Sequence, residues 1–347
     1  MTVQVREAVR ELRDRGALRR DGSRPALPLP TTGGPGPVVA VIADPGHKTL
    51  TRDLCGLAAR LAADVNGSTV LMAPHEVGAT DAGSWGADRL LRIVGCDVEE
   101  DIAVAVSSAV WEMPLRPWAI LAGSTAYGRE VASRVAATLG AGLTGDATDV
   151  EVVDGRLVAW KPAFGGQLVA AVTATSPVQM VTMRSGVVPP SLSRRQVAAL
   201  STLTVQPRSR LWVHRRQQED ALESLSQADA VIGVGQGVTP EDLHELDELC
   251  DVLAAPIGCT RKVTDSGWMP HARQIGVTGR AISPGLYVAI GTSGKFNHMV
   301  GVRAAGTVLA INPDREALVW QYADAGVVAP FQECVPLLVK ELREALS

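Results

Sequence analysis

The chain has few aromatic side chains and no long apolar run. Phe, Trp and Tyr make up 4% of its 347 residues, although hydrophobic residues make up 46%. The core must therefore consist mainly of Ala, Val, Leu and Ile, in segments that 34 glycines interrupt. Short aliphatic runs of this kind are typical of buried parallel strands, so the composition favours an α/β fold.

Cysteine is also scarce, and a long basic run is lacking. The five cysteines are scattered, and none stands in a metal-binding Cys-x-x-Cys or Cys/His pattern, so we expect reduced thiols, no metal and a cytoplasmic protein. No segment reaches the roughly 18 apolar residues that a membrane-spanning helix needs, and no signal peptide is evident at the N-terminus. A net charge of −4 without a long basic run argues against nucleic acid or a membrane as partner.

The length predicts two domains. We divide the chain into a charged, Pro/Gly-rich extension at 1–36, an α/β domain at 37–207 and a second α/β domain at 208–347. The extension is expected to lie outside the main fold. Residues 190–213 carry weak structural signals and several arginines, which is typical of a solvated connector.

Both domains alternate strand, loop and helix, the pattern of a parallel sheet with two covered faces. The strands are expected at 37–43, 68–73, 118–122, 178–183, 286–290 and 307–311, and at 230–237, where the strand ends in glycines. In the first domain, Asp154-Gly155 predicts an antiparallel hairpin, because both residues tolerate the positive φ of a primed turn. The fold class is therefore α/β, with two doubly wound domains and mainly parallel sheets.

Polar groups and glycines gather where strands of the second domain end. The sequence Gly-Thr-Ser-Gly at 291–294 follows a buried strand, and free backbone N–H groups at such a turn suit a phosphate. Gly235-Gln-Gly237 and a glycine loop at 274–279 lie nearby in the same domain. Each feature alone also fits an ordinary turn, and His298 alone fits a buried core histidine. Their shared position at strand ends favours a ligand site.

Longer motifs in this region resemble the flavin domain of electron-transfer flavoprotein alpha subunits. They are Gly258-Cys-Thr-Arg261, Asp265-Ser-Gly267, Gln274-Ile-Gly-Val-Thr-Gly279, Pro284-Gly-Leu-Tyr-Val-Ala-Ile-Gly-Thr-Ser-Gly294, Ala310-Ile-Asn312 and Ala323-Asp-Ala-Gly-Val-Val-Ala329. Their order and spacing agree, and segments of the first domain such as Lys161-Pro-Ala-Phe-Gly-Gly166 also look like the family.

The resemblance implies that the second domain binds FAD. Thr278 would bond the isoalloxazine near N5 or O4, His298 would approach the C2 carbonyl, and the Ser293 loop would hold ribityl or pyrophosphate oxygens. Asn312 and Asp324 would hold the adenosine end. The full set of expected cofactor residues is Gln236, Thr260, Arg261, Gln274, Gly276, Val277, Thr278, Gly279, Gly291, Thr292, Ser293, Gly294, Lys295, Asn297, His298, Asn312 and Asp324.

The sequence departs from the family at three places in this set. Gln236 stands where many members carry arginine, and Val277 replaces a glutamine. Lys295 is the first residue of Lys-Phe-Asn at 295–297, where family members usually have smaller and less charged residues. A neutral amide supplies no positive field, so we expect a shifted, lower flavin potential unless Lys295 restores the charge.

The family resemblance implies an electron carrier without substrate turnover of its own. It would pair with an electron-transfer flavoprotein beta subunit, receive electrons from an acyl-CoA-type or other dehydrogenase, and pass them to an acceptor such as a quinone-linked oxidoreductase. Two alternatives stay open, a nicotinamide-binding oxidoreductase of related topology and an assembly subunit without flavin. Against the first, no Gly-x-Gly-x-x-Gly follows the first strand.

Overall fold

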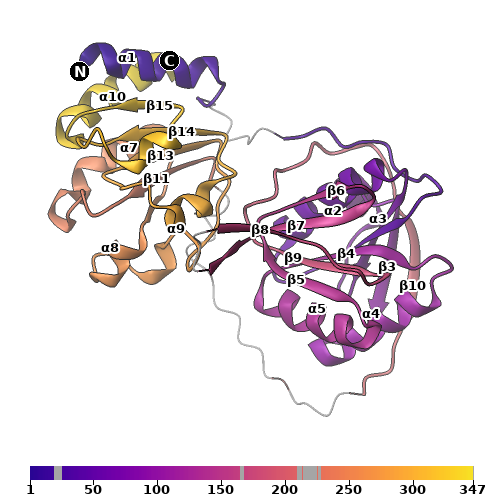
Figure 1. Ribbon diagram of the computed structural model, residues 1–347. Coiled ribbons are helices and arrows are strands. Elements are labelled where there is room, and N and C mark those ends of the chain that lie inside the picture. Colours follow the sequence, from indigo (N-terminus) through magenta and orange to yellow (C-terminus); the bar gives the residue numbers. More distant parts are fainter. Residues whose placement is uncertain (19–25, 165–167, 209–212, 214–224, 226–227, 347) are drawn as a thin grey trace. The chain divides into compact units, whose positions relative to one another are not determined.

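A computed structural model describes residues 1–18, 26–164, 168–208, 213, 225 and 228–346. These residues form two compact units. One contains most of the chain between Ala26 and Gln218, and the other combines Met1–Pro25 with Glu219–Ser347. Each unit is built on its own parallel sheet, as the sequence predicts (Figure 1).

The first unit has a seven-stranded parallel sheet with the order β10-β3-β2-β1-β4-β9-β5. Its central strand β1 is buried along its whole length, which explains why this segment is aliphatic throughout. The strands are β1 (Val38–Ile42), β2 (Ser68–Ala73), β3 (Arg89–Val94), β4 (Pro117–Gly123), β5 (Gly142–Ala147), β9 (Gln179–Met183) and β10 (Ala199–Thr204), and the helices are α2 (Lys48–Asp64), α3 (Ala79–Trp85), α4 (Glu99–Glu112) and α5 (Ala126–Leu139).

A separate three-stranded sheet contains the expected hairpin. Strands β6 (Asp149–Val153) and β7 (Arg156–Ala163) pair antiparallel, and the turn residues Asp154 and Gly155 have φ values of 50° and 72°. Positive φ at both positions confirms the primed turn. Strand β8 (Leu168–Val172) completes this sheet beside β7.

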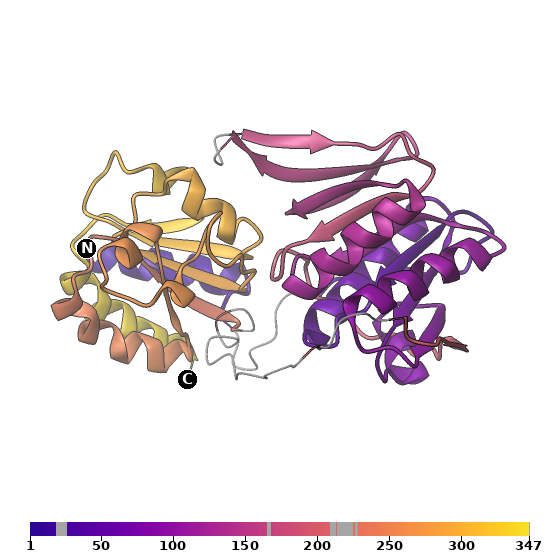
Figure 2. The same ribbon diagram turned by 90° about the horizontal axis from the view of Figure 1, so that it is seen from below.

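The second unit has a five-stranded parallel sheet with the order β12-β11-β13-β14-β15. Alternate residues of β11 enter different clusters: Ile232 packs with α7 and α10, whereas Val231 packs with Ile275 and Met299. The sheet is thus covered on both faces, as Figure 2 shows. Its elements are β11 (Ala230–Val234), η2 (Pro240–Leu246), α7 (Asp247–Leu253), β12 (Ile257–Cys259), α8 (Arg261–Asp265), η3 (His271–Arg273), β13 (Leu286–Ile290), α9 (Phe296–Met299), η4 (Val300–Val302), β14 (Thr307–Ile311), η5 (Leu318–Gln321), β15 (Ala325–Val327) and α10 (Phe331–Leu346).

The N-terminal segment is not an extension outside the fold, contrary to expectation. Helix α1 (Thr2–Asp14) buries Val5, Ala8, Val9 and Leu12 in the same core as α10 and β15. These four positions lie on one face of a helix, and their burial removes apolar surface from water. The helix is therefore part of the second unit, and Figure 1 shows it in indigo beside the yellow α10.

Residues 26–36 belong instead to the first unit. The Leu27 N–H donates to the Pro190 carbonyl at 2.9 Å, and the Gly33 N–H donates to the Gly67 carbonyl at 3.0 Å. Arg194, expected in a solvated connector, is half-buried and pairs with Asp88 at 2.9 Å. The chain from 190 to 204 is thus held by the first unit, and β10 within it pairs with β3.

Candidate functional site

Two glycine turns meet at the carboxyl ends of β11 and β13. A Cβ at Gly235 would lie 2.7 Å from the Thr292 Cα, and one at Gly237 would lie 2.9 Å from the Gly291 Cα. Gly291 itself has a φ of 59°, which favours glycine. Because the turns pack backbone to backbone, no side chain fits between them, and the surface beside them stays open.

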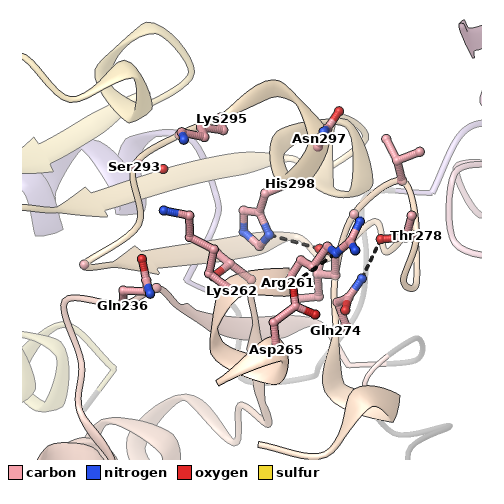
Figure 3. Close-up of a pocket in the computed structure, with 17 residues that line it drawn as sticks. Gln236, Arg261, Lys262, Asp265, Gln274, Thr278, Ser293, Lys295, Asn297 and His298 are labelled. Carbon is pink, nitrogen blue, oxygen red and sulfur yellow. Dashed lines mark hydrogen bonds and ion pairs between the residues drawn. The ribbon is translucent and has the colours of Figure 1, made fainter. Parts of the chain in front are cut away.

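A cavity of about 600 Å³ lies beside these turns, within the size range of cofactor pockets. Figure 3 shows its polar side chains arranged around the opening. It brings together thirteen expected residues: Gln236, Thr260, Arg261, Gln274, Gly276, Val277, Thr278, Gly291, Ser293, Gly294, Lys295, Asn297 and His298. Four further lining residues were outside the expected set: Lys262, which no motif singled out, and Gly235, Asp265 and Ile275, which stand in motifs quoted above.

The 274–279 loop forms one wall and is fixed by its own hydrogen bonds. The Gln274 amide donates to the Thr278 hydroxyl at 2.7 Å (Figure 3) and accepts from the Thr264 hydroxyl at 2.8 Å. The Val277 N–H donates to the Asn297 carbonyl at 2.8 Å, which ties the loop to α9. Since Thr278 accepts from Gln274, its own hydroxyl hydrogen is available to a ligand.

His298 reaches the cavity as a buried, neutral ring. Its Nδ1 lies 3.1 Å from the Ile275 carbonyl, which can only accept, so Nδ1 carries the hydrogen. Nε2 then accepts from the Tyr287 hydroxyl at 2.6 Å. Burial lowers the His298 pKa to about 4. Both ring nitrogens are engaged by protein groups, so a bond to a flavin carbonyl requires His298 to give up one of them.

Charge in the cavity comes from helix α8 and the turn after β13. Arg261 pairs with Asp265 at 3.2 Å, whereas Lys262 and Lys295 have no ion pair with any described residue. Gln236, on the turn after β11, is neutral. The cavity therefore has an excess of positive charge, which suits an anionic ligand.

Thr292 and Asn312 lie behind the Gly291 turn rather than in the cavity wall. The Asn312 amide donates to the Thr292 carbonyl at 2.8 Å. The Thr292 hydroxyl is buried and has no hydrogen-bond partner among the described residues. A buried hydroxyl without a partner is costly, so this edge fits a polar ligand. Gly279 also lies outside the wall, where a Cβ would meet the Gln274 side chain at 3.0 Å.

Asp324 is not brought to this edge of the sheet. It accepts from the Val308 N–H at 2.8 Å and from Arg15 of α1 at 2.8 Å. Val308 is near the start of β14, whereas Asn312 follows its end. Four residues of strand separate the two by about 13 Å. Asn312 and Asp324, both expected to hold the adenosine end, are therefore not brought together: Asn312 follows the end of β14, and Asp324 lies beside its start.

Comparison with known families identifies the class of the protein. Residues 39–207 match the model of the electron transfer flavoprotein domain, and residues 224–303 match that of the electron transfer flavoprotein FAD-binding domain. The first match covers the sheet of the first unit, and the second covers β11, β12 and β13 of the second unit. FAD is thus the cofactor of the second unit, whose open cavity and excess positive charge fit such a group.

Individual relatives show which family within this class the chain belongs to. The chain is 33% identical over 282 residues to the protein FixB of Azorhizobium caulinodans, covering 78% of this chain and 76% of the relative. It is 33% identical to the electron transfer flavoprotein subunit alpha of Bacillus subtilis, covering 66% and 71%. It is 36% identical to the putative electron transfer flavoprotein subunit YdiR of Escherichia coli, covering 65% and 74%. The chain belongs to the electron transfer flavoprotein alpha subunit family.

Two other features, a metal site and a membrane-spanning helix, are not found in the part of the chain that the structure describes. There, no group of three or more His, Cys, Asp and Glu side chains is arranged to hold a metal ion. The helices described are also too short or too polar to cross a membrane.

Proposed function

We propose that this chain is the FAD-carrying subunit of a heterodimeric electron carrier and has no substrate turnover of its own. The supporting observation is the cavity at the strand ends of the second unit, which gathers thirteen of the residues expected to contact FAD. The partner subunit would be an electron-transfer flavoprotein beta subunit. Electrons would come from an acyl-CoA-type or other dehydrogenase and leave to an acceptor such as a quinone-linked oxidoreductase.

FAD, when bound, supplies the chemistry of accepting and releasing electrons. The residues of the chain hold it and set its surroundings. Thr278 donates its hydroxyl hydrogen toward the ring, Asn297 and Gln236 supply neutral amides, and the Ser293 turn supplies hydroxyl and backbone donors. His298 contributes a dipole and no net charge. Fixed donors of this kind favour negative charge on a bound ring and so raise its affinity for electrons.

A cytoplasmic location is also part of this proposal. All five cysteines are free thiols, and Cys55, Cys96, Cys259 and Cys334 are buried. Burial raises the pKa of the Cys259 and Cys334 thiols to about 11, which protects them from reaction. Free buried thiols suit a reducing compartment.

Replacing Thr278 by valine tests the role of the loop hydroxyl. Thr278→Val keeps the side-chain shape and removes both the hydroxyl donor and the acceptor of the Gln274 amide, so we expect FAD to bind about tenfold more weakly. FAD affinity is measured by titration of the purified chain, followed by its visible absorption. Thr138→Val, on the exposed face of α5 in the other unit, is the matched control. Equal FAD affinity in Thr278→Val and the wild type would show that the Thr278 hydroxyl does not contribute to FAD binding.

A further inference from the structure

The cavity has two cations without an ion pair to any residue that the structure describes. Arg261 is held by Asp265 at 3.2 Å. Lys262 and Lys295 line the same cavity, and neither forms an ion pair within the described part of the chain. Both side chains are exposed, so each ammonium group can move to meet a ligand. In Figure 3 the Lys262 ammonium lies inside the ring of labelled side chains.

The topology places the two lysines on either side of β11. Lys262 belongs to α8, which follows β12, and Lys295 follows the glycine turn after β13. Strands β12 and β13 are the two neighbours of β11 in the sheet. Neighbouring strands are about 4.8 Å apart, so the two connections flank the Gly235–Gly237 turn at a separation of about 10 Å. A ligand lying over that turn meets a lysine on each side.

The turn itself cannot supply this charge. Gly235 and Gly237 pack against Thr292 and Gly291 so closely that neither tolerates a side chain. The one side chain on the turn belongs to Gln236, which is neutral. Positive charge for an anionic ligand must therefore come from the flanking connections.

We propose that Lys262 and Lys295 bind the phosphates of the dinucleotide cofactor from the two sides of the β11 turn. This inference rests on the proposed function of the cavity. An ammonium group is a compact charge that suits phosphate oxygens, and the Ser293 hydroxyl lies in the same wall. The isoalloxazine of oxidised FAD is uncharged, so the phosphates carry the negative charge that these lysines meet.

The test measures the affinity of the full-length chain for oxidised FAD at low and high NaCl. The variants are Lys262→Gln, Lys295→Gln and the double variant, with Lys340→Gln on the exposed side of α10 as the control. We expect each single variant to bind FAD about tenfold more weakly at low salt, and the double variant to lose most of the salt dependence. The Lys340→Gln variant should match the wild type.

Three results are informative. A double variant that binds oxidised FAD as tightly as the wild type overturns the inference. If its affinity is unchanged and its midpoint potential falls, the lysines act on the reduced ring rather than on the phosphates, which also overturns it. If the wild type itself binds no FAD, the proposed function fails, and this outcome is distinct from failure of the lysines alone.

Discussion

At the scale of residues, the Tyr287–His298 pair is the most constrained part of the site. The tyrosine hydroxyl and the imidazole Nε2 are both buried and lie 2.6 Å apart. Gly233 makes room for the ring, because a Cβ there would meet the Tyr287 side chain. The pair fixes the tautomer of His298 and keeps it neutral.

Removing the tyrosine hydroxyl should therefore be costly. In Tyr287→Phe the buried Nε2 loses its donor, and we expect the free energy of unfolding to fall by about 1–3 kcal/mol. Tyr322→Phe is the control, because Tyr322 is 40% exposed. Urea unfolding of the two variants compares them. A loss no larger than that of the control would mean that the hydrogen bond adds little.

His298 should also make stability depend on pH. Its pKa is about 4 in the folded chain, against 6.5 for a free imidazole. The unfolded state therefore binds the proton first as the pH falls, and stability present above pH 6.5 is lost between 6.5 and 4. The size of this loss is about 3 kcal/mol. A His298→Gln variant should lack this part of the pH dependence, and an unchanged profile would show that His298 titrates normally.

Gln236 offers a direct test of the electrostatics around the cofactor. Gln236→Arg adds a positive charge to the cavity wall and should favour the reduced cofactor by on the order of 1 kcal/mol, which raises the midpoint potential. Gln236→Leu adds no charge and serves as the control. Potentiometry measures both. Equal midpoints in Gln236→Arg and the wild type would show that this position does not set the potential.

The residues of the site were predictable where they follow a strand closely. Gly291 and Ser293 stand directly after an aliphatic run, so the sequence places them at a strand end, whereas the 274–279 loop follows no strand closely and was found from its resemblance to the family motif. A residue lies at the cavity edge of the sheet only if it follows a strand. Asp324 precedes β15, and the spacing of residues in the sequence does not show this. Lys262 could have been found from its position beside Thr260 and Arg261, but a charge at a helix start is usually solvated.

At the scale of elements, aliphatic strands were predictable and polar ones were not. Strands β1, β4, β11, β13 and β14 consist mostly of Val, Ile, Leu and Ala and are almost entirely buried. Strand β10 at the sheet edge is mostly exposed, so its sequence lacks the continuous hydrophobic run that identifies a buried strand. Its pairing with β3 depends on the tertiary structure.

Helix α1 was misjudged because its charges hide a narrow apolar face. The signal was present in the spacing of Val5, Ala8, Val9 and Leu12, which share one side of a helix. Arg6 and Arg15 then reach Glu341 and Asp324, each at 2.8 Å. Exposed pairs of this kind contribute little, so the apolar face must provide most of the binding of α1 to the second unit.

A truncation within α1 tests this assignment. Leu12 is fully buried, whereas Val3 on the same helix is 68% exposed. We expect Leu12→Ala to lower the free energy of unfolding of the second unit by about 2–5 kcal/mol, and Val3→Ala to change it by less than about 0.5 kcal/mol. Denaturant unfolding compares the two variants. If both cost equally little, α1 is not part of the core.

At the scale of the whole molecule, each unit has its own sheet and its own core. The chain enters the second unit twice, first as α1 and again from β11 onward, with the first unit between. The expected two-domain α/β organisation is confirmed, but the assignment of the N-terminus to a free extension fails. Composition could not reveal this, because the partner of α1 lies more than 300 residues away in the sequence.

Hydrogen exchange can show which parts respond to the cofactor together. FAD at a hundred times its dissociation constant stabilises the unit that binds it by about 2.7 kcal/mol. We expect slower exchange in β11–β14 and also in α1, because they share one core, and no change in β1–β4. If FAD does not slow hydrogen exchange in the α1 peptides, α1 does not share a core with the unit that binds the cofactor.

The central claim is that the cavity beside the Gly291–Gly294 turn holds FAD, and one titration tests it most directly. Ser293 lines the cavity with an exposed side chain, so Ser293→Trp should fill the site without disturbing the core. Ser266→Trp, at an exposed position that does not line the cavity, is the control. We predict one FAD per chain for the wild type and Ser266→Trp, and none for Ser293→Trp. Wild-type protein that binds no FAD, or a Ser293→Trp variant that binds it normally, would contradict the account.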